Sequence, residues 1–189
     1  MDTNKTACFI GHRKINETDE LKEKIYNTVE GLIINKGVTS FLFGSRSDFD
    51  SLCKKIVADL QQKYPDVKRT YIRAEYEYIS DSYKDYLLEN CDDTYFPEKV
   101  SGAGRASYVE RNQIMINLSD YCIFYYDENC LPPRRRNSRR DLTDYQPKSG
   151  TKVAYDYAVK KKQEIINLFH WYRNPLWNFS KGDISLFIL

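Results

Sequence analysis

The sequence of 189 residues lacks several patterns that would define its biochemistry directly. It contains only two histidines, and its five cysteines are scattered and form no CxxC pair: Cys8, Cys53, Cys91, Cys122 and Cys130. An odd number of scattered thiols indicates reduced cysteines and argues against a disulfide framework or a zinc site. Walker A, HExxH and nucleophile-elbow motifs are also absent. We therefore expect no metal and no bound cofactor.

The sequence also lacks a long apolar run and a strong excess of charge of either sign. No uninterrupted apolar segment approaches the ~20 residues that span a bilayer, and the N-terminus lacks the pattern of a secretory signal. The 29 basic and 27 acidic side chains give a net charge of +2, which indicates no general attraction to nucleic acid. We therefore expect a cytoplasmic protein with no membrane partner.

A hydrophobic fraction of 41% is enough for the core of a globular domain. We expect one domain over residues 1–189, with a loop insertion near 127–148 and a C-terminal extension near 170–189. The extension is aromatic, and an exposed aromatic segment would suit a contact between two copies of the chain. The composition is therefore compatible with a homo-oligomer.

Short apolar runs alternate with longer segments of helical periodicity along the chain. The runs predict strands at 6–10, 38–43, 67–73, 121–126 and 164–169. Helices are expected at 17–36 and 48–63, from 108 to about 118, and after 149, while 76–99 is interpreted as a short helix and a loop. This alternation predicts an α/β, Rossmann-like, doubly wound fold, with a mainly parallel sheet of about five strands and helices on both faces.

Ligands of such sheets bind at the carboxyl ends of the strands, where the strand order reverses. Gly11, His12 and Arg13 directly follow the first predicted strand. Glycine permits a tight turn, arginine offers two donors to phosphate, and we expect His12 to donate a hydrogen bond rather than act as a base. The alternative is a glycine that ends the strand, followed by an exposed basic pair.

The second predicted strand leads into Gly44, Ser45, Arg46 and, after one helical turn, Asp50. Free backbone N–H groups at the start of the next helix favour an anion, the serine hydroxyl adds a donor, and Asp50 suits a ribose hydroxyl. Ordinary capping of the helix by Ser47 explains the same residues equally well.

Two helix starts complete the set of candidates. Arg111 and Asn112, next to Glu110, are expected to reach across a ligand, unless they form a solvated helical face. Ser149, Gly150 and Thr151 offer N–H groups and hydroxyls to a second anion, unless they only cap the helix that follows.

Two further segments carry weaker signals. Residues 101–105, with the sequence SGAGR, resemble the start of a dinucleotide fingerprint, but the third glycine is absent and a hinge fits better. The arginine run at 134–140 would suit nucleic acid, although it lacks the interleaved aromatic residues that stack on bases. A solvated basic loop is the alternative.

Together these motifs resemble the SLOG superfamily, a Rossmann-like group that includes the DprA/Smf and LOG proteins, and in particular its YpsA-like branch. The resemblance rests on the sequence ACFIGHR at 7–13, on the turn from Gly44 to Asp50, on the helix ERNQIM at 110–115, and on Gly150-Thr151. It covers residues 5 to 169. One departure concerns activity, because LOG proteins carry a carboxylate three residues after the threonine, where this chain has Ala154.

The resemblance implies binding of a nucleotide or a nucleotide-derived, ADP-ribose-like small molecule at the carboxyl edge of the sheet, in a sensor or effector domain. One alternative is a nucleotide N-glycosidase of the LOG type, with Asp50 or Glu110 as candidate catalytic residues. A DprA-like protein that binds single-stranded DNA through the arginine run is the third hypothesis. Whether the chain is an enzyme stays open at this point.

Overall fold

The computed structural model describes residues 4–132, 135–136, 144–145 and 147–169 of the chain. The strands of the main sheet are β1 (Lys5–Gly11), β2 (Val38–Phe43), β3 (Lys68–Ile72), β4 (Asp93–Tyr95), β5 (Tyr121–Tyr125) and β8 (Glu164–Asn167). The helices are α1 (Asp19–Lys36), α2 (Asp48–Lys63), α3 (Asp81–Asn90), α4 (Ser107–Asn117) and α5 (Gly150–Lys160). Two 3₁₀ helices, η1 (Glu98–Val100) and η2 (Gly104–Ala106), and a small hairpin, β6 (Arg135–Arg136) with β7 (Asp144–Tyr145), complete the described elements.

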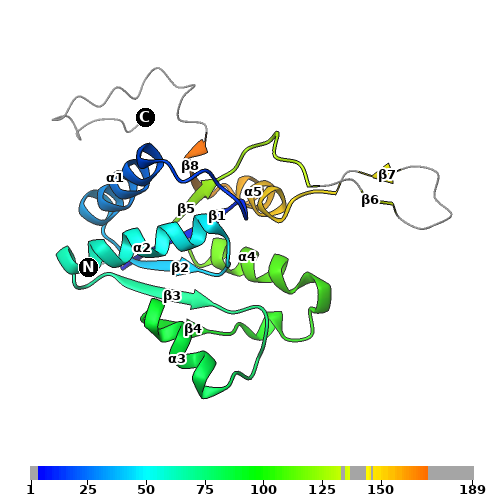
Figure 1. The fold of residues 1–189 in the computed structure, drawn as a ribbon, viewed down its shortest axis with the longest axis horizontal. Helices are drawn as coiled ribbons and strands as arrows, with labels where there is room; N and C mark the ends of the chain where they lie inside the picture. Colours follow the sequence, from blue (N-terminus) through cyan, green and yellow to red (C-terminus); the bar gives the residue numbers. More distant parts are fainter. Residues whose placement is uncertain (1–3, 133–134, 137–143, 146, 170–189) are drawn as a thin grey trace.

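The main sheet has six strands in the order β4-β3-β2-β1-β5-β8, and every neighbouring pair is parallel (Figure 1). The chain first moves outward from β1 to β4 and then returns to the other side of β1 to form β5 and β8. The strand order therefore reverses between β1 and β5, and the crevice that such a reversal opens lies at their carboxyl ends.

Side chains of β1 alternate between the two faces of this sheet. Ala7 and Phe9 pack in one core with residues of α1, α2 and α3, while Cys8 and Ile10 pack in a second core with residues of α4 and α5. The rings of Phe9 and Phe43 stack with their centroids 5.0 Å apart. Both faces of the sheet are covered, so the predicted Rossmann-like arrangement is confirmed.

Local signals in the sequence define most element ends. Thr18 caps α1 because its hydroxyl accepts the N–H of Leu21, and Gly37 ends that helix with a φ of 70°. The helix predicted from residue 17 thus begins at Asp19. Between its ends, Leu21, Ile25, Val29 and Leu32 are buried at helical spacing.

The expectation of about five strands missed one strand of the main sheet. Strand β4 lies in the stretch 76–99, which was interpreted as a short helix and a loop; the helix is α3. Asp93 and Tyr95 are exposed in this three-residue edge strand, so no buried apolar run marks it in the sequence. The fifth predicted strand is β8, which ends at Asn167 rather than at residue 169.

Other expectations fall partly or wholly on residues that are not described. The C-terminal extension at 170–189 and most of the arginine run at 134–140 lie outside the described residues. Among the described helices, none is long and apolar enough to cross a membrane. The described thiols are all free, and only Cys130 is exposed.

Close packing at the end of β1 gives a first prediction. A Cβ at position 11 would lie 2.3 Å from Cδ1 of Phe49, a ring that is fully buried against Phe9 and Tyr125 and cannot move freely. We expect Gly11→Ala to lower the free energy of unfolding by about 1–3 kcal/mol, measured by urea denaturation. Gly31→Ala is the control, because the nearest atom to its Cβ lies at 3.9 Å and alanine in mid-helix stabilises by about 0.5–1 kcal/mol. Equal unfolding midpoints for the two variants would contradict this packing.

Candidate functional site

Three of the predicted site segments meet at the carboxyl edge of the sheet. Thr151 at the start of α5 donates its hydroxyl hydrogen to the carbonyl oxygen of Gly11, at 3.0 Å. The N–H of Asp48, at the start of α2, donates to the carbonyl oxygen of Arg13, at 2.9 Å. Residues 11–13, the turn before α2 and the start of α5 are therefore joined by direct hydrogen bonds.

His12 links this edge to the segment after β5. Its side chain is 6% exposed, and its Nε2 accepts the N–H of Asp127 at 2.8 Å. Burial lowers the pKa of His12, although hydrogen bonding to Asp127 opposes this effect. The same Nε2 lies 3.2 Å from the carbonyl oxygen of Asp127. The tautomer of the ring therefore decides whether His12 donates to this oxygen, as expected, or accepts the N–H.

The turn between β2 and α2 is held by its own polar groups. Ser47 caps α2, since its hydroxyl accepts the N–H of Asp50 at 3.1 Å. The hydroxyl of Ser45 donates to that of Ser47 at 2.8 Å and accepts the N–H of Ser47 at 3.0 Å. The capping interpretation therefore holds for Ser47. The hydroxyl of Ser45 is engaged within the turn.

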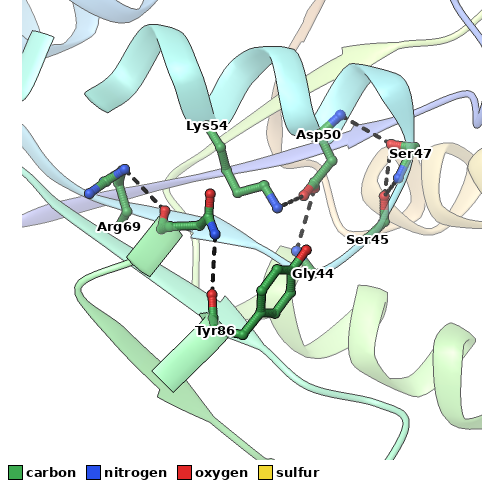
Figure 2. Close-up of polar contacts among 8 residues, drawn as sticks. Gly44, Ser45, Ser47, Asp50, Lys54, Arg69 and Tyr86 are labelled. Atoms are coloured by element: carbon green, nitrogen blue, oxygen red, sulfur yellow. Dashed lines mark hydrogen bonds and ion pairs between the residues drawn. The ribbon is translucent and has the colours of Figure 1, made fainter. Parts of the chain in front are cut away.

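Asp50 is a buried carboxylate at the base of the same turn (Figure 2). It is 1% exposed, its Oδ1 accepts the N–H of Gly44 at 3.5 Å, and its Oδ2 lies 3.6 Å from Nζ of Lys54. Burial raises the pKa of Asp50 to about 6, although the positive charges of Lys54 and Arg111 oppose this effect. Oδ2 has no hydrogen-bond partner among the described residues.

Arg111 approaches the same turn from α4, on the other face of the sheet, and lies beside Gly44. A Cβ at position 44 would lie 2.6 Å from Cδ of Arg111 and 2.7 Å from Sδ of Met115. The Arg111 side chain therefore fills the space beside Gly44, and a side chain at position 44 would displace it. Arg111 is 3% exposed and its Nε donates to Oδ1 of Asn112 at 3.0 Å. No described group accepts a hydrogen bond from its Nη1.

Sequence reasoning missed Tyr71 and Lys54, which lie in this polar cluster. Burial lowers the pKa of Arg111, whereas Tyr71, Asp50 and Glu75 oppose this effect. Tyr71 at the end of β3 is 2% exposed, and its hydroxyl has no hydrogen-bond partner within the described residues. The Nζ of Lys54, also missed, lies 5.5 Å from the centroid of the Tyr71 ring. Both residues read as ordinary helix and strand positions, so no motif could have identified them.

Other predicted residues are placed less centrally. Arg13, Arg46 and Gly150 are exposed, and the Ser149 hydroxyl caps α5 by accepting the N–H of Lys152. Glu110 is half-buried, and no hydrogen bond or ion pair joins it to Arg111 or Asp50. Residues 101–105 follow η1 rather than a strand, and Gly102 and Gly104 have positive φ. That geometry differs from a dinucleotide fingerprint, which begins directly after a strand.

Two cavities lie beside the carboxyl end of β5. The first, of about 230 Å³, is lined by His12, Lys14, Ile15, Asn16, Tyr125, Asp127, Cys130 and Phe169. The second, of about 200 Å³, is lined by Tyr126, Glu128, Cys130, Leu131, Pro147, Lys148, Ser149 and Lys152. They share Cys130, and Gly44, Asp50 and Arg111 line neither. The edge therefore has a buried polar cluster at β2 and two open cavities near the strand reversal.

Within the described part of the chain, no three His, Cys, Asp or Glu side chains gather as a metal site would require. The parallel sheet, the reversal of strand order and the loops at its carboxyl edge define a protein of the Rossmann-like doubly wound class. A model described as the YspA SLOG family matches residues 9–165, which is more than half of the chain. The chain belongs to this family, and the predicted YpsA-like, SLOG identity is confirmed.

No curated protein matches the chain. Among solved structures, the molybdenum cofactor carrier protein of Chlamydomonas reinhardtii is similar to it, with 13% sequence identity and a TM-score of 0.48. The similarity covers 86% of this chain and 75% of that chain.

The buried carboxylate gives a second prediction. Between pH 3.8 and about 6 the folded state holds a proton on Asp50 that the unfolded state has lost, so this residue makes stability fall as pH rises. Above pH 6 the buried charge of Asp50 lowers the free energy of unfolding by at most about 3 kcal/mol. We expect Asp50→Asn to remove this fall, so that the variant gains stability relative to the parent between pH 4 and 7. Urea unfolding across that range measures the difference, and a constant difference would contradict the buried charge.

Proposed function

We propose that the chain binds a phosphorylated nucleotide or a nucleotide derivative of the ADP-ribose type at the carboxyl edge of its sheet, as a sensor or effector domain. The observation that carries this proposal is Arg111. A guanidinium group that is buried in the protein and leaves Nη1 unpaired is costly, unless an acceptor joins it in the functional state. A phosphate or a sugar oxygen supplies such an acceptor.

Positive charge elsewhere at this edge supports the same class of ligand. Lys14 lines the first cavity, Lys148 and Lys152 line the second, and Arg13 is exposed after β1. The N-terminus of α5, with an exposed Gly150, lies beside the second cavity. Each cavity is smaller than the ~300 Å³ typical of a complete ligand site, so each suits one part of a nucleotide. Membership of a SLOG family agrees with this choice.

The proposed roles follow from these positions. Arg13, Arg46 and Arg111 neutralise phosphate, the N–H groups around Gly44 and Gly150 donate to it, and Asp50 accepts from a ribose hydroxyl. Because Oδ1 of Asp50 already accepts the N–H of Gly44, this role requires the ligand to reach Oδ2, which accepts no hydrogen bond from the described residues.

The test is a calorimetric titration with ribose 5-phosphate, AMP, UMP and ADP-ribose. We expect Arg111→Ala to weaken binding by about 10- to 100-fold, because a charge-assisted hydrogen bond is lost. Arg111→Lys keeps the positive charge but cannot form a bidentate hydrogen bond to phosphate, so this variant should bind with intermediate affinity. Arg13→Ala should also weaken binding without affecting the fold, since its side chain is exposed.

The control for these variants is Lys68→Ala, which removes an exposed charge at the start of β3, at the opposite edge of the sheet. Its affinity should equal that of the parent, and thermal denaturation verifies that each variant is folded. Unchanged affinity in both Arg13→Ala and Arg111→Ala would remove the proposed site.

A steric variant tests the same site from the β2 side. The atoms that a Cβ at position 44 would meet belong to the flexible ends of Arg111 and Met115, so the fold can accommodate Gly44→Ala by moving them. We expect a small loss of stability and a roughly tenfold loss of nucleotide affinity, because the guanidinium is displaced. Gly31→Ala, far from the edge in α1, should retain full affinity. Retained affinity in Gly44→Ala would show that the position of Arg111 does not matter.

Hydrolysis of a nucleotide N-glycosidic bond is the second candidate function, and Asp50 favours it. A carboxyl group with a pKa near 6 is suited to general acid–base work. Against it, Ala154 is 2% exposed and packs in the core between α4, α5 and the sheet, so no carboxylate stands at that position. Free base released from nucleoside monophosphates, and lost in Asp50→Asn, would favour this function over simple binding.

A further inference from the structure

The stretch from residue 76 to residue 86 displays aromatic side chains that the core does not use. Tyr76, Tyr78 and Tyr86 are 63%, 88% and 57% exposed, and only Leu87 is buried in α3. Exposed aromatic rings gathered in one short segment of a folded chain are typical of a binding surface.

Two tyrosine rings from this region stack on each other, and Arg46 donates to the hydroxyl of one of them; we call Arg46, Tyr83 and Tyr86 the aromatic platform. The rings of Tyr83 and Tyr86 lie 6.2 Å apart with an angle of 17° between their planes. The guanidinium carbon of Arg46 lies 5.6 Å from the centroid of Tyr83, and its Nη2 donates to the Tyr83 hydroxyl. The hydrogen bond raises the pKa of Arg46, so this end of the platform is firmly cationic.

The platform adjoins the polar cluster around Arg111. Arg46 belongs to the same turn as Gly44 and directly precedes the cap of α2. The side chains of Tyr71 and Glu75 act electrostatically on both Arg46 and Arg111, in agreement with the short separation of Gly44 and Arg46 in this turn. A molecule whose phosphate reaches Arg111 therefore has an aromatic surface within its own length.

We propose that the aromatic platform binds the nucleobase of the ligand by stacking. This inference rests on the proposed function and adds the site of the base to it. Every nucleobase has a π-face, which stacks on a tyrosine ring or on an arginine plane, and the larger purine ring gains more than a pyrimidine. Tyr86 is the group that takes the base, because its ring is the more exposed end of the stack.

The experiment titrates ribose 5-phosphate, AMP and UMP into the full chain and its variants. We expect the parent to bind AMP roughly tenfold more tightly than ribose 5-phosphate, with UMP between them. Tyr86→Ala should lose that tenfold advantage for AMP and leave the affinity for ribose 5-phosphate unchanged. Tyr86→Phe keeps the ring and should bind AMP as the parent does.

The matched control is Leu88→Ala, which removes a 39% exposed apolar side chain from the same helix and should change neither affinity. If Tyr86→Ala binds AMP as tightly as the parent while Arg111→Ala does not, the platform proposal is wrong and the proposed function stands. If Tyr86→Ala instead dissociates an oligomer in size-exclusion chromatography with unchanged AMP affinity, the ring serves a contact between copies, which also overturns the proposal. If the parent binds none of the three compounds, both the proposed function and the platform proposal are wrong.

Discussion

The close passage of the Arg111 side chain beside Gly44 is the interaction on which the rest of the site depends. It carries a positive charge from α4 to the end of β2, where it lies near Asp50 and Tyr71. No described residue forms an ion pair with that charge within 4 Å, and Nη1 stays unpaired. Most buried guanidinium groups in stable folds are fully paired, and the unpaired Nη1 is therefore the observation on which the proposed ligand depends.

Sequence patterns predicted the parts of the fold that rest on local rules. Apolar runs predicted the five longer strands, and the predicted end of the first helix at residue 36 agrees with the end that Gly37 defines, because capping depends on neighbouring residues alone. The rule that ligands bind where parallel strands end also predicted that Gly11 and Thr151 would meet, although 140 residues separate them. Strand β4 escaped this reasoning, since a three-residue edge strand with exposed side chains has no apolar signature.

Side-chain direction could not be predicted from the same patterns. Sequence reasoning assigned Arg46 to phosphate and Asp50 to a ribose, but it did not predict that Arg46 donates to Tyr83 or that Asp50 is buried. The first contact depends on α3 and the burial of Asp50 on the packing of the whole edge, and neither follows from neighbouring residues alone. The importance of Tyr71 was hidden for the same reason: a tyrosine in a strand is ordinary until its hydroxyl is found buried and unpaired.

The carboxylate of Asp50 occupies the turn after β2 and therefore affects the binding of any anion at this turn. Asp50 already accepts the N–H of Gly44, so an incoming phosphate competes for the same donor and meets a like charge. A second negative charge raises the proton affinity of the carboxyl group further, and occupancy of the turn becomes coupled to uptake of a proton from solvent. In calorimetry, the apparent heat of association would then vary with the ionisation enthalpy of the buffer, and tighter complexes would form under mildly acidic conditions.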